Sequence, residues 1–154
     1  MDKFGVLKAD IDRELKNLER LTLELNTVLG TTSESTIVRS RAAGSVIHDF
    51  YTGVEKIFRR IAVRVDQDLP TGQDWHVQLL QRMNVPLEGF RPQVITESLA
   101  RNLEEYLRFR HLFRNIYGFE LRWERCEPLA SRLDKTLADL KEQIGHFEDF
   151  LSSI

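Results

Sequence analysis

The chain has 154 residues, of which 42% are hydrophobic and 30% are charged, and its formal net charge is −2. This length and composition are typical of a single soluble domain, residues 1–154, with a sizeable hydrophobic core. The slightly acidic balance gives the surface as a whole no attraction for nucleic acid, so DNA is not an expected partner and any anion site must be local.

Apolar residues recur at steps of three and four along most of the chain, which predicts amphipathic helices. We expect helices over residues 3–28, 36–65, 74–83, 97–117 and 124–151. Thr71 and Asp74 resemble a capping box for the third of these, whereas Thr96 is expected to cap the fourth and Gly118 to end it. No stretch of useful length alternates as a strand would. The prediction is an all-α antiparallel bundle of four to five helices.

Other features of the sequence exclude several classes of protein. No apolar run approaches the ~18 residues of a membrane span, and residues 1–10 lack the pattern of a signal peptide, so no membrane association is expected. The single cysteine, Cys126, suits a reducing compartment, and a cytoplasmic location is predicted. Asp66 and Asp68 lack the strands that carry such a pair in a nucleotidyltransferase, and they are expected in a solvated loop. The histidines have no metal-ligand spacing, so neither a metal nor a cofactor is expected.

The fourth expected helix carries an arginine within its apolar side. With about 100° per residue counted from Leu103, Arg110 falls at about 340° and Tyr117 at about 320°, inside the arc that holds Phe109 and Phe113. A guanidinium is nearly always charged and costly to bury without a partner. A carboxylate, a partner chain or an anionic ligand must therefore face Arg110.

The polar residues around Arg110 suit one kind of ligand. Arg110, Arg114 and Tyr117 share one side of the helix, and His111 and Asn115 form a second row four residues apart. A guanidinium fork pairs with phosphate oxygens, and histidine moves protons near neutral pH, so this set favours a phosphodiester. The alternative is that Arg110 pairs with a glutamate at the edge of the core while Tyr117 covers the end of the bundle.

Three other aromatic side chains have two interpretations each. His48 lies on the polar side of the second helix, which is either a solvated face or one wall of a groove beside the Arg110 helix where His48 helps to bind an anion. Trp75 and Trp123 each follow a turn. We expect them to cover the core rather than to stack on nucleic-acid bases.

Two runs of sequence resemble the HepT-like branch of the HEPN superfamily. One is Leu-Arg-Phe-Arg-His-Leu-Phe-Arg-Asn-Ile-Tyr-Gly-Phe-Glu-Leu at residues 107–121. The other is Ile-His-Asp-Phe-Tyr-Thr-Gly-Val-Glu-Lys-Ile-Phe at residues 47–58, followed by Leu-Pro-Thr-Gly-Gln-Asp-Trp-His at residues 69–76. The likeness covers about residues 40–125 in matching order, and it implies a HEPN-like helical bundle that dimerises.

The motif of the family can be placed on this chain residue by residue. In HepT proteins it reads arginine, four residues, histidine, one residue, tyrosine. The arginine falls on Arg110 and the tyrosine on Tyr117, while His111 occupies the polar position after the arginine. Asn115 stands where the family has its histidine. A carboxamide does not titrate near neutral pH, so Asn115 cannot supply the proton transfer that the family pattern implies.

The resemblance implies a small cytoplasmic ribonuclease toxin whose two subunits bring two copies of the motif into one cleft. It implies RNA cleavage without a metal, by attack of the ribose 2′-OH on the adjacent phosphate. It also implies a minimal nucleotidyltransferase antitoxin as partner, which adenylylates (AMPylates) the motif tyrosine, here Tyr117. A wet cleft between chains would in addition accommodate Arg110 more easily than a dry core.

The leading hypothesis is a toxin–antitoxin endoribonuclease that works as a homodimer. In it Arg110 clamps the phosphate, His111 acts as acid and base, Asn115 orients the ribose and Tyr117 is modified. The further expected RNA contacts are Arg114, Arg108 and His48. One alternative is a degenerate HEPN scaffold that binds RNA or a nucleotidyltransferase without cleaving. Another is a purely structural helical interaction protein.

Overall fold

The computed structural model describes residues 2–31 and 35–154, which are almost entirely helical. Its α-helices are α1 (Gly5–Gly30), α2 (Thr36–Ile61), α3 (Trp75–Met83), α4 (Glu97–Asn115), α5 (Trp123–Ser131) and α6 (Leu133–Ser152). The π-helical turn η1 (Ala62–Asp66) extends α2, and the 3₁₀ turn η2 (Gly118–Glu120) follows α4. No strand occurs in these two ranges, where the only β pairing is a bridge between Leu87 and Arg91. The predicted all-α class is confirmed.

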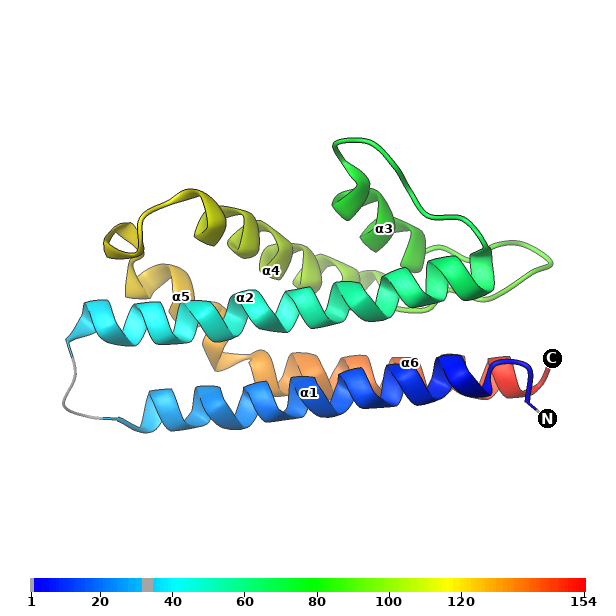
Figure 1. The fold of residues 1–154 in the computed structure, drawn as a ribbon, viewed down its shortest axis with the longest axis horizontal. Helices are drawn as coiled ribbons and strands as arrows, with labels where there is room; N and C mark the ends of the chain where they lie inside the picture. The colour runs from blue at the N-terminus through cyan, green and yellow to red at the C-terminus, as the bar shows by residue number, and fades with distance from the viewer. Residues whose placement is uncertain (1, 32–34) are drawn as a thin grey trace.

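The helices are arranged around α2. Figure 1 shows α1 and α2 as two long antiparallel helices, with α6 alongside α1 and both termini at one end of the molecule. Helices α4 and α5 pack on α2, and the short α3 packs against α2 and α4. Among the described residues, no helix is long and apolar enough to cross a bilayer.

Two glycines of α2 let its neighbours approach closely. A Cβ on Gly53 would lie 2.5 Å from Cδ2 of Leu18 in α1. A Cβ on Gly44 would lie 2.8 Å from Cε1 of Phe113 in α4 and 2.6 Å from Cδ2 of Leu121. Real Cβ atoms do not come that close, so alanine at either position would force these side chains to shift. The sequence of α2 thus permits packing on two sides.

The helix starts agree only in part with the caps expected from the sequence. Thr96 accepts a hydrogen bond from the backbone N–H of Leu99, so the cap expected there forms, and Ser35 caps α2 in the same way by accepting the N–H of Val38. Asp74 precedes α3 but makes no capping bond with its side chain. Its φ of −97° and ψ of 18° lie outside the extended region that N-caps use. The predicted capping box at Thr71 and Asp74 is therefore wrong.

The last predicted helix, residues 124–151, is two helices in the structure. The break lies at Arg132, whose φ of −112° and ψ of 10° are not helical. Before it α5 packs on α2, and after it α6 packs along α1. The chain changes neighbours at this point, and periodicity within one amphipathic run does not reveal such a change.

A buried ion pair anchors the loop between α3 and α4. The guanidinium of Arg91 donates to both carboxylate oxygens of Asp66, at 2.6 and 3.0 Å, and both side chains are buried. Asp68, two residues later, is exposed. The expectation of a solvated loop thus holds for Asp68 and is wrong for Asp66, because its partner lies 25 residues further along the chain.

Candidate functional site

Arg110 lies on the buried side of α4 and is paired to a carboxylate. Its side chain is 3% exposed, and Nη2 donates to Oε2 of Glu55 in α2 at 2.9 Å. Nη1 reaches the hydroxyl of Thr52 at 3.5 Å, and the guanidinium carbon lies 5.0 Å from the ring centroid of Tyr51. The prediction that a partner faces Arg110 is confirmed. Of the carboxylate, partner chain or anionic ligand that were considered, the partner is the carboxylate of Glu55.

His76, the second residue of α3, completes this cluster. Its Nδ1 lies 2.7 Å from Oε2 of Glu55 and 3.1 Å from Nη2 of Arg110. The imidazole packs on the indole of Trp75, with ring centroids 3.7 Å apart. Its side chain is 33% exposed, whereas that of Glu55 is 9% exposed. The cluster of Arg110, Glu55 and His76, called here the Arg110 cluster, therefore reaches the surface at the imidazole.

The backbone fixes the last residue of α3 to the segment just before α4. The N–H groups of Val94 and Ile95 both donate to the carbonyl of Met83, the last residue of α3, at 2.9 and 3.1 Å. Burial and the nearby carboxylate of Glu55 raise the pKa of Tyr51, so its phenol stays neutral beside the cluster. These contacts place one carboxylate and one imidazole around a guanidinium in a mostly dry site.

His48 and Arg114 form a second polar pair along the same two helices. Nε of Arg114 donates to Nε2 of His48 at 3.0 Å, and Nδ1 of His48 lies 3.1 Å from Oδ1 of Asp49. The hydroxyl of Thr52 donates to the carbonyl of His48 at 3.1 Å and also touches Arg110. Two of the expected RNA contacts therefore contact each other near the Arg110 cluster, while the groove and the anion binding of the second interpretation stay predictions. Their binding to RNA stays a prediction.

The remaining expected site residues of α4 lie away from the cluster. His111 and Asn115 are exposed, and Nδ2 of Asn115 donates to the carbonyl of His111 at 2.7 Å. In the part of the chain that the structure describes, the imidazole of His111 makes no hydrogen bond. Arg108 is exposed and donates to Glu104 at 2.9 Å. The structure thus brings Arg110, Arg114 and His48 together and leaves these three outside.

Tyr117 does not lie in the apolar arc of α4. The helix ends at Asn115, and Ile116 is extended with φ of −125° and ψ of 160°. Tyr117 is 71% exposed and stacks on Phe119, with ring centroids 5.3 Å apart and an interplanar angle of 6°. The side chain of Glu120 accepts the N–H of Tyr117 at 2.8 Å and stabilises this turn. The expectation that Tyr117 covers the end of the bundle is therefore wrong.

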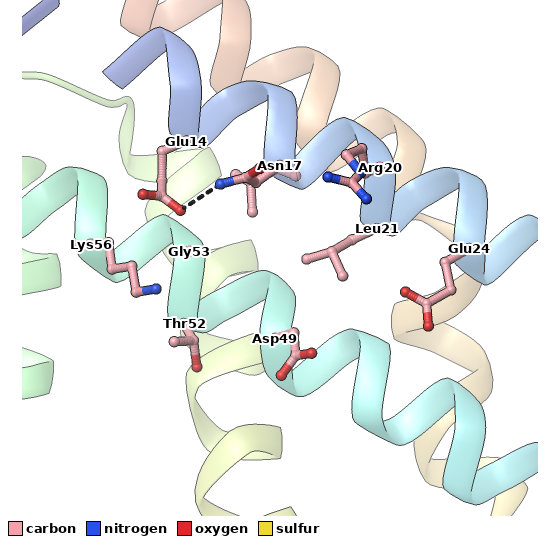
Figure 2. A pocket seen from close by; sticks show the side chains of 10 residues that line it. Glu14, Asn17, Arg20, Leu21, Glu24, Asp49, Thr52, Gly53 and Lys56 are labelled. Atoms are coloured by element: carbon pink, nitrogen blue, oxygen red, sulfur yellow. Dashed lines mark hydrogen bonds between the residues drawn. The ribbon is translucent and has the colours of Figure 1, made fainter. Parts of the chain in front are cut away.

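A groove between α1 and α2 is a poor candidate for an anion site. It has a volume of about 490 Å³, and Figure 2 shows its lining residues along the two helices. Its charged residues are three carboxylates and two cations: Glu14, Glu24, Asp49, Arg20 and Lys56. Thr52 borders the groove on one side and contacts Arg110 on the other. This balance of charge gives a phosphate no net attraction.

The single thiol does not act as a nucleophile at neutral pH. Cys126 is buried, and burial raises the pKa of its thiol to about 11. The thiolate is the reactive form of cysteine, and it is scarce under these conditions.

Comparison with known proteins identifies the family of this chain. A family model described as HepT-like protein matches residues 42–151, which include most of α2, the Arg110 cluster and nearly all of α6. No match was found among curated proteins or among solved structures. The likeness seen in the two runs of sequence is confirmed over a longer stretch. This chain belongs to the HepT-like family of the HEPN superfamily.

Proposed function

We propose that the protein is the toxin of a HepT-type toxin–antitoxin pair, and that it is a homodimeric endoribonuclease that cleaves RNA without a metal. Membership of the HepT-like family supports the toxin–antitoxin class. The observation that carries the enzymatic part is the Arg110 cluster, in which a buried guanidinium and carboxylate contact a partly exposed imidazole. Such groups supply positive charge and proton transfer, the two requirements for breaking a phosphodiester.

The surroundings of the cluster fit an RNA backbone better than its centre does. Arg114 and Arg59 are exposed, and the guanidinium of Arg59 lies 5.2 Å from the ring centroid of Trp75. Arg110 itself faces Glu55, so a phosphate reaches it only by displacing that carboxylate. We therefore assign the first phosphate contacts to Arg114, with His48 beside it.

Cleavage of RNA in the presence of EDTA is the test of this function. We expect purified dimeric protein to cut single-stranded RNA and to leave 2′,3′-cyclic phosphate and 5′-hydroxyl ends. An RNA of the same sequence with 2′-O-methyl groups is the matched control, because it binds in the same way but has no nucleophile. Failure to cut any RNA, or equal cutting of the methylated RNA, would contradict the proposed reaction. Sedimentation of the same sample as a clean monomer would contradict the dimer.

Tyr117 is the expected site of modification by the partner. The chain has three tyrosines, all within the described ranges, and Tyr51 and Tyr106 are 1% and 0% exposed while Tyr117 is 71% exposed. Co-expression with a nucleotidyltransferase encoded next to this gene is expected to raise the intact mass by one or more AMP units. The increase should vanish in Tyr117→Phe and persist in Tyr51→Phe. An increase retained by Tyr117→Phe would exclude this site.

A second candidate function is a HepT-like scaffold that binds RNA or the nucleotidyltransferase without cleaving. Two observations favour it: the side chain of Arg110 is bound to Glu55 in the core, and Asn115 occupies the position of the motif histidine. Retention of RNA on the protein without any cleavage in the assay above would select this function. The Glu55 contact also gives Arg110 a structural role, as the alternative with a glutamate at the edge of the core predicted.

A further inference from the structure

We propose that His76 transfers the proton in this site and that Glu55 is its positioning residue. His76 would thus take the role of the motif histidine, whose position in this chain is occupied by Asn115. This inference rests on the proposed ribonuclease function. It adds a residue from α3, outside the helix that carries the motif. It also moves the proton transfer from His111 to an imidazole that the fold holds against a carboxylate.

The contact with Glu55 determines which nitrogen of the imidazole is available. Nδ1 of His76 lies 2.7 Å from Oε2 of Glu55, and a carboxylate at that distance accepts a hydrogen bond. Nη2 of Arg110 also lies 3.1 Å from Nδ1, but it already donates to Oε2 of Glu55. We therefore assign the proton to Nδ1 and, in the neutral ring, the lone pair to Nε2. No hydrogen bond within the described residues uses Nε2. This is the arrangement of a histidine base oriented by a carboxylate, as in a Ser-His-Asp triad.

Arg110 holds the carboxylate in place. It donates to the same oxygen, Oε2 of Glu55, at 2.9 Å, and both side chains are buried. A carboxylate fixed by two donors from two other helices cannot rotate away from the imidazole without breaking both contacts. Arg110 thus acts in this conformation as a positioning residue for Glu55. The three side chains come from α2, α3 and α4, so the arrangement exists only in the folded bundle.

His76 is also placed where a substrate can reach it. Its side chain is 33% exposed, about ten times the 3% of Arg110. One side of the ring is supported by Trp75 at 3.7 Å between centroids, and the guanidinium of Arg59 lies over that indole. The charged groups in contact with the imidazole are Glu55 from α2 and Arg110 from α4, and the guanidinium of Arg59 contacts the adjoining indole. The positive charge of these two guanidinium groups suits a phosphate group.

His111 is accessible, but it lacks an orienting partner. It is exposed on α4, no carboxylate of the described residues bonds to its ring, and its carbonyl is the group that Asn115 binds. An imidazole without an orienting partner samples both tautomers and several rotamers, which weakens its action as a base. The geometry therefore favours His76 over His111.

The bonds and protons of the proposed reaction balance with His76 as the only side chain that gains and loses a proton. Nε2 takes the proton of the ribose 2′-OH while the 2′-oxygen forms a bond to phosphorus. The bond between phosphorus and the 5′-oxygen breaks, and that oxygen takes a proton from water. The proton on His76 neutralises the hydroxide that remains. The products are a 2′,3′-cyclic phosphate and a 5′-hydroxyl, and the imidazole returns to its starting form.

The test compares His76→Gln with His111→Gln over a range of pH. Glutamine can still donate to Glu55 but does not titrate, so it preserves the structural contact and removes the proton transfer. We expect kcat/KM for RNA cleavage to fall by about 10²–10⁴-fold in His76→Gln and to stay near that of the wild type in His111→Gln. In the wild type the rate should rise with pH as Nε2 loses its proton and then level off. The residual rate of His76→Gln should lack this rise, whereas a purely structural role would lower the rate at every pH alike.

A second measurement covers the case in which His76→Gln does not fold. Diethyl pyrocarbonate modifies the imidazoles of the wild-type protein, and peptide mass spectrometry follows each of the four histidines separately. Loss of cleavage is expected to follow modification of His76 and to be reversed by hydroxylamine. Cleavage that survives in folded His76→Gln, or that follows modification of His111 instead, would overturn this inference and leave the ribonuclease function standing. A wild-type protein that cuts no RNA would end both.

Discussion

Replacing Glu55 with leucine is expected to lower the free energy of unfolding by about 3–5 kcal/mol, because it leaves the guanidinium of Arg110 buried without a carboxylate. Among the described residues, the only other hydrogen-bonding groups near that guanidinium are the hydroxyl of Thr52 at 3.5 Å and Nδ1 of His76 at 3.1 Å. Neither carries negative charge. Urea unfolding followed by circular dichroism measures the loss as a fall in the midpoint at an unchanged slope.

Arg110 and Glu55 are not equivalent partners, and removing one should cost more stability than removing the other. Arg110→Met leaves Glu55 with the hydrogen bond to His76, so its cost should be smaller than that of Glu55→Leu. The double variant Glu55→Leu and Arg110→Met removes both charges, and it should recover most of the stability that Glu55→Leu loses. A double variant no more stable than Glu55→Leu would show that packing, rather than an uncompensated charge, sets the cost.

An exposed ion pair of the same helix is the matched control. Arg108 and Glu104 form an i, i+4 pair at 2.9 Å, with side chains 73% and 40% exposed. Because water screens this pair, Glu104→Leu should change the free energy of unfolding by no more than about 0.5 kcal/mol. A loss at Glu104 as large as that at Glu55 would mean that leucine, and not the lost charge, is responsible.

The pair of Arg110 and Glu55 also changes the argument for a dimer. From the sequence, an arginine in an apolar arc suggested a wet cleft between two chains. The structure places a carboxylate of the same chain against it, so that physical reason no longer applies. The proposed homodimer now rests on the HepT-like family alone. Its interface need not include Arg110.

The helical architecture was predictable because each helix buries one side and the buried residues repeat at helical spacing. Leu7, Ile11, Leu18 and Leu25 of α1 follow this rule, and each is almost completely buried. The caps at Ser35 and Thr96 were predictable for a similarly local reason, since a side-chain oxygen bonds to a backbone group three residues away. Local periodicity and local hydrogen bonds are what a single sequence shows directly.

The members of the Arg110 cluster were less predictable because their contacts are distant in the sequence. The need for an anion beside Arg110 followed from burial and charge. Its identity did not, because Glu55 lies in a row of polar residues on α2 that looks like a solvated face. Helices α3 and α4 pack against α2 and bury Glu55, whereas Arg59 in the same row stays exposed. His76 lies 21 residues from Glu55, and only the packing of α3 reveals their contact.

The end of α4 shows a further limit of periodicity. Ile116 and Tyr117 continue the apolar pattern, yet the helix ends before them. Gly118 lies against α2, where a Cβ would come 2.2 Å from Nε of Arg41. Glu120 also accepts the N–H of Tyr117, which offers that backbone group a partner outside the helix. The contact of Gly118 with α2 and the hydrogen bond to Glu120 thus end the helix two residues before the apolar pattern ends.

Replacing Arg91 with methionine is expected to destabilise the protein by about 3–5 kcal/mol, the range typical of a broken buried ion pair. Its guanidinium is fully buried, and besides both oxygens of Asp66 it donates to the carbonyls of Val85, Pro92 and Arg82. Methionine satisfies none of these acceptors and leaves Asp66 buried without a partner. Arg91→Lys should recover only part of the loss, since an ammonium cannot form the paired contacts of the planar fork.

Arg82 provides the comparison for Arg91 in the same segment. It pairs with Asp68, whose side chain is 72% exposed, and it also donates to the Asp68 carbonyl at 2.8 Å. Because that pair lies in water, Arg82→Met should cost no more than about 1 kcal/mol in urea unfolding. Equal losses for Arg82→Met and Arg91→Met would refute the role given to the buried pair.

Because Arg91 fixes the loop that follows α3, its loss should also loosen α3. In Arg91→Met, hydrogen exchange should therefore accelerate more at α3 than at α1.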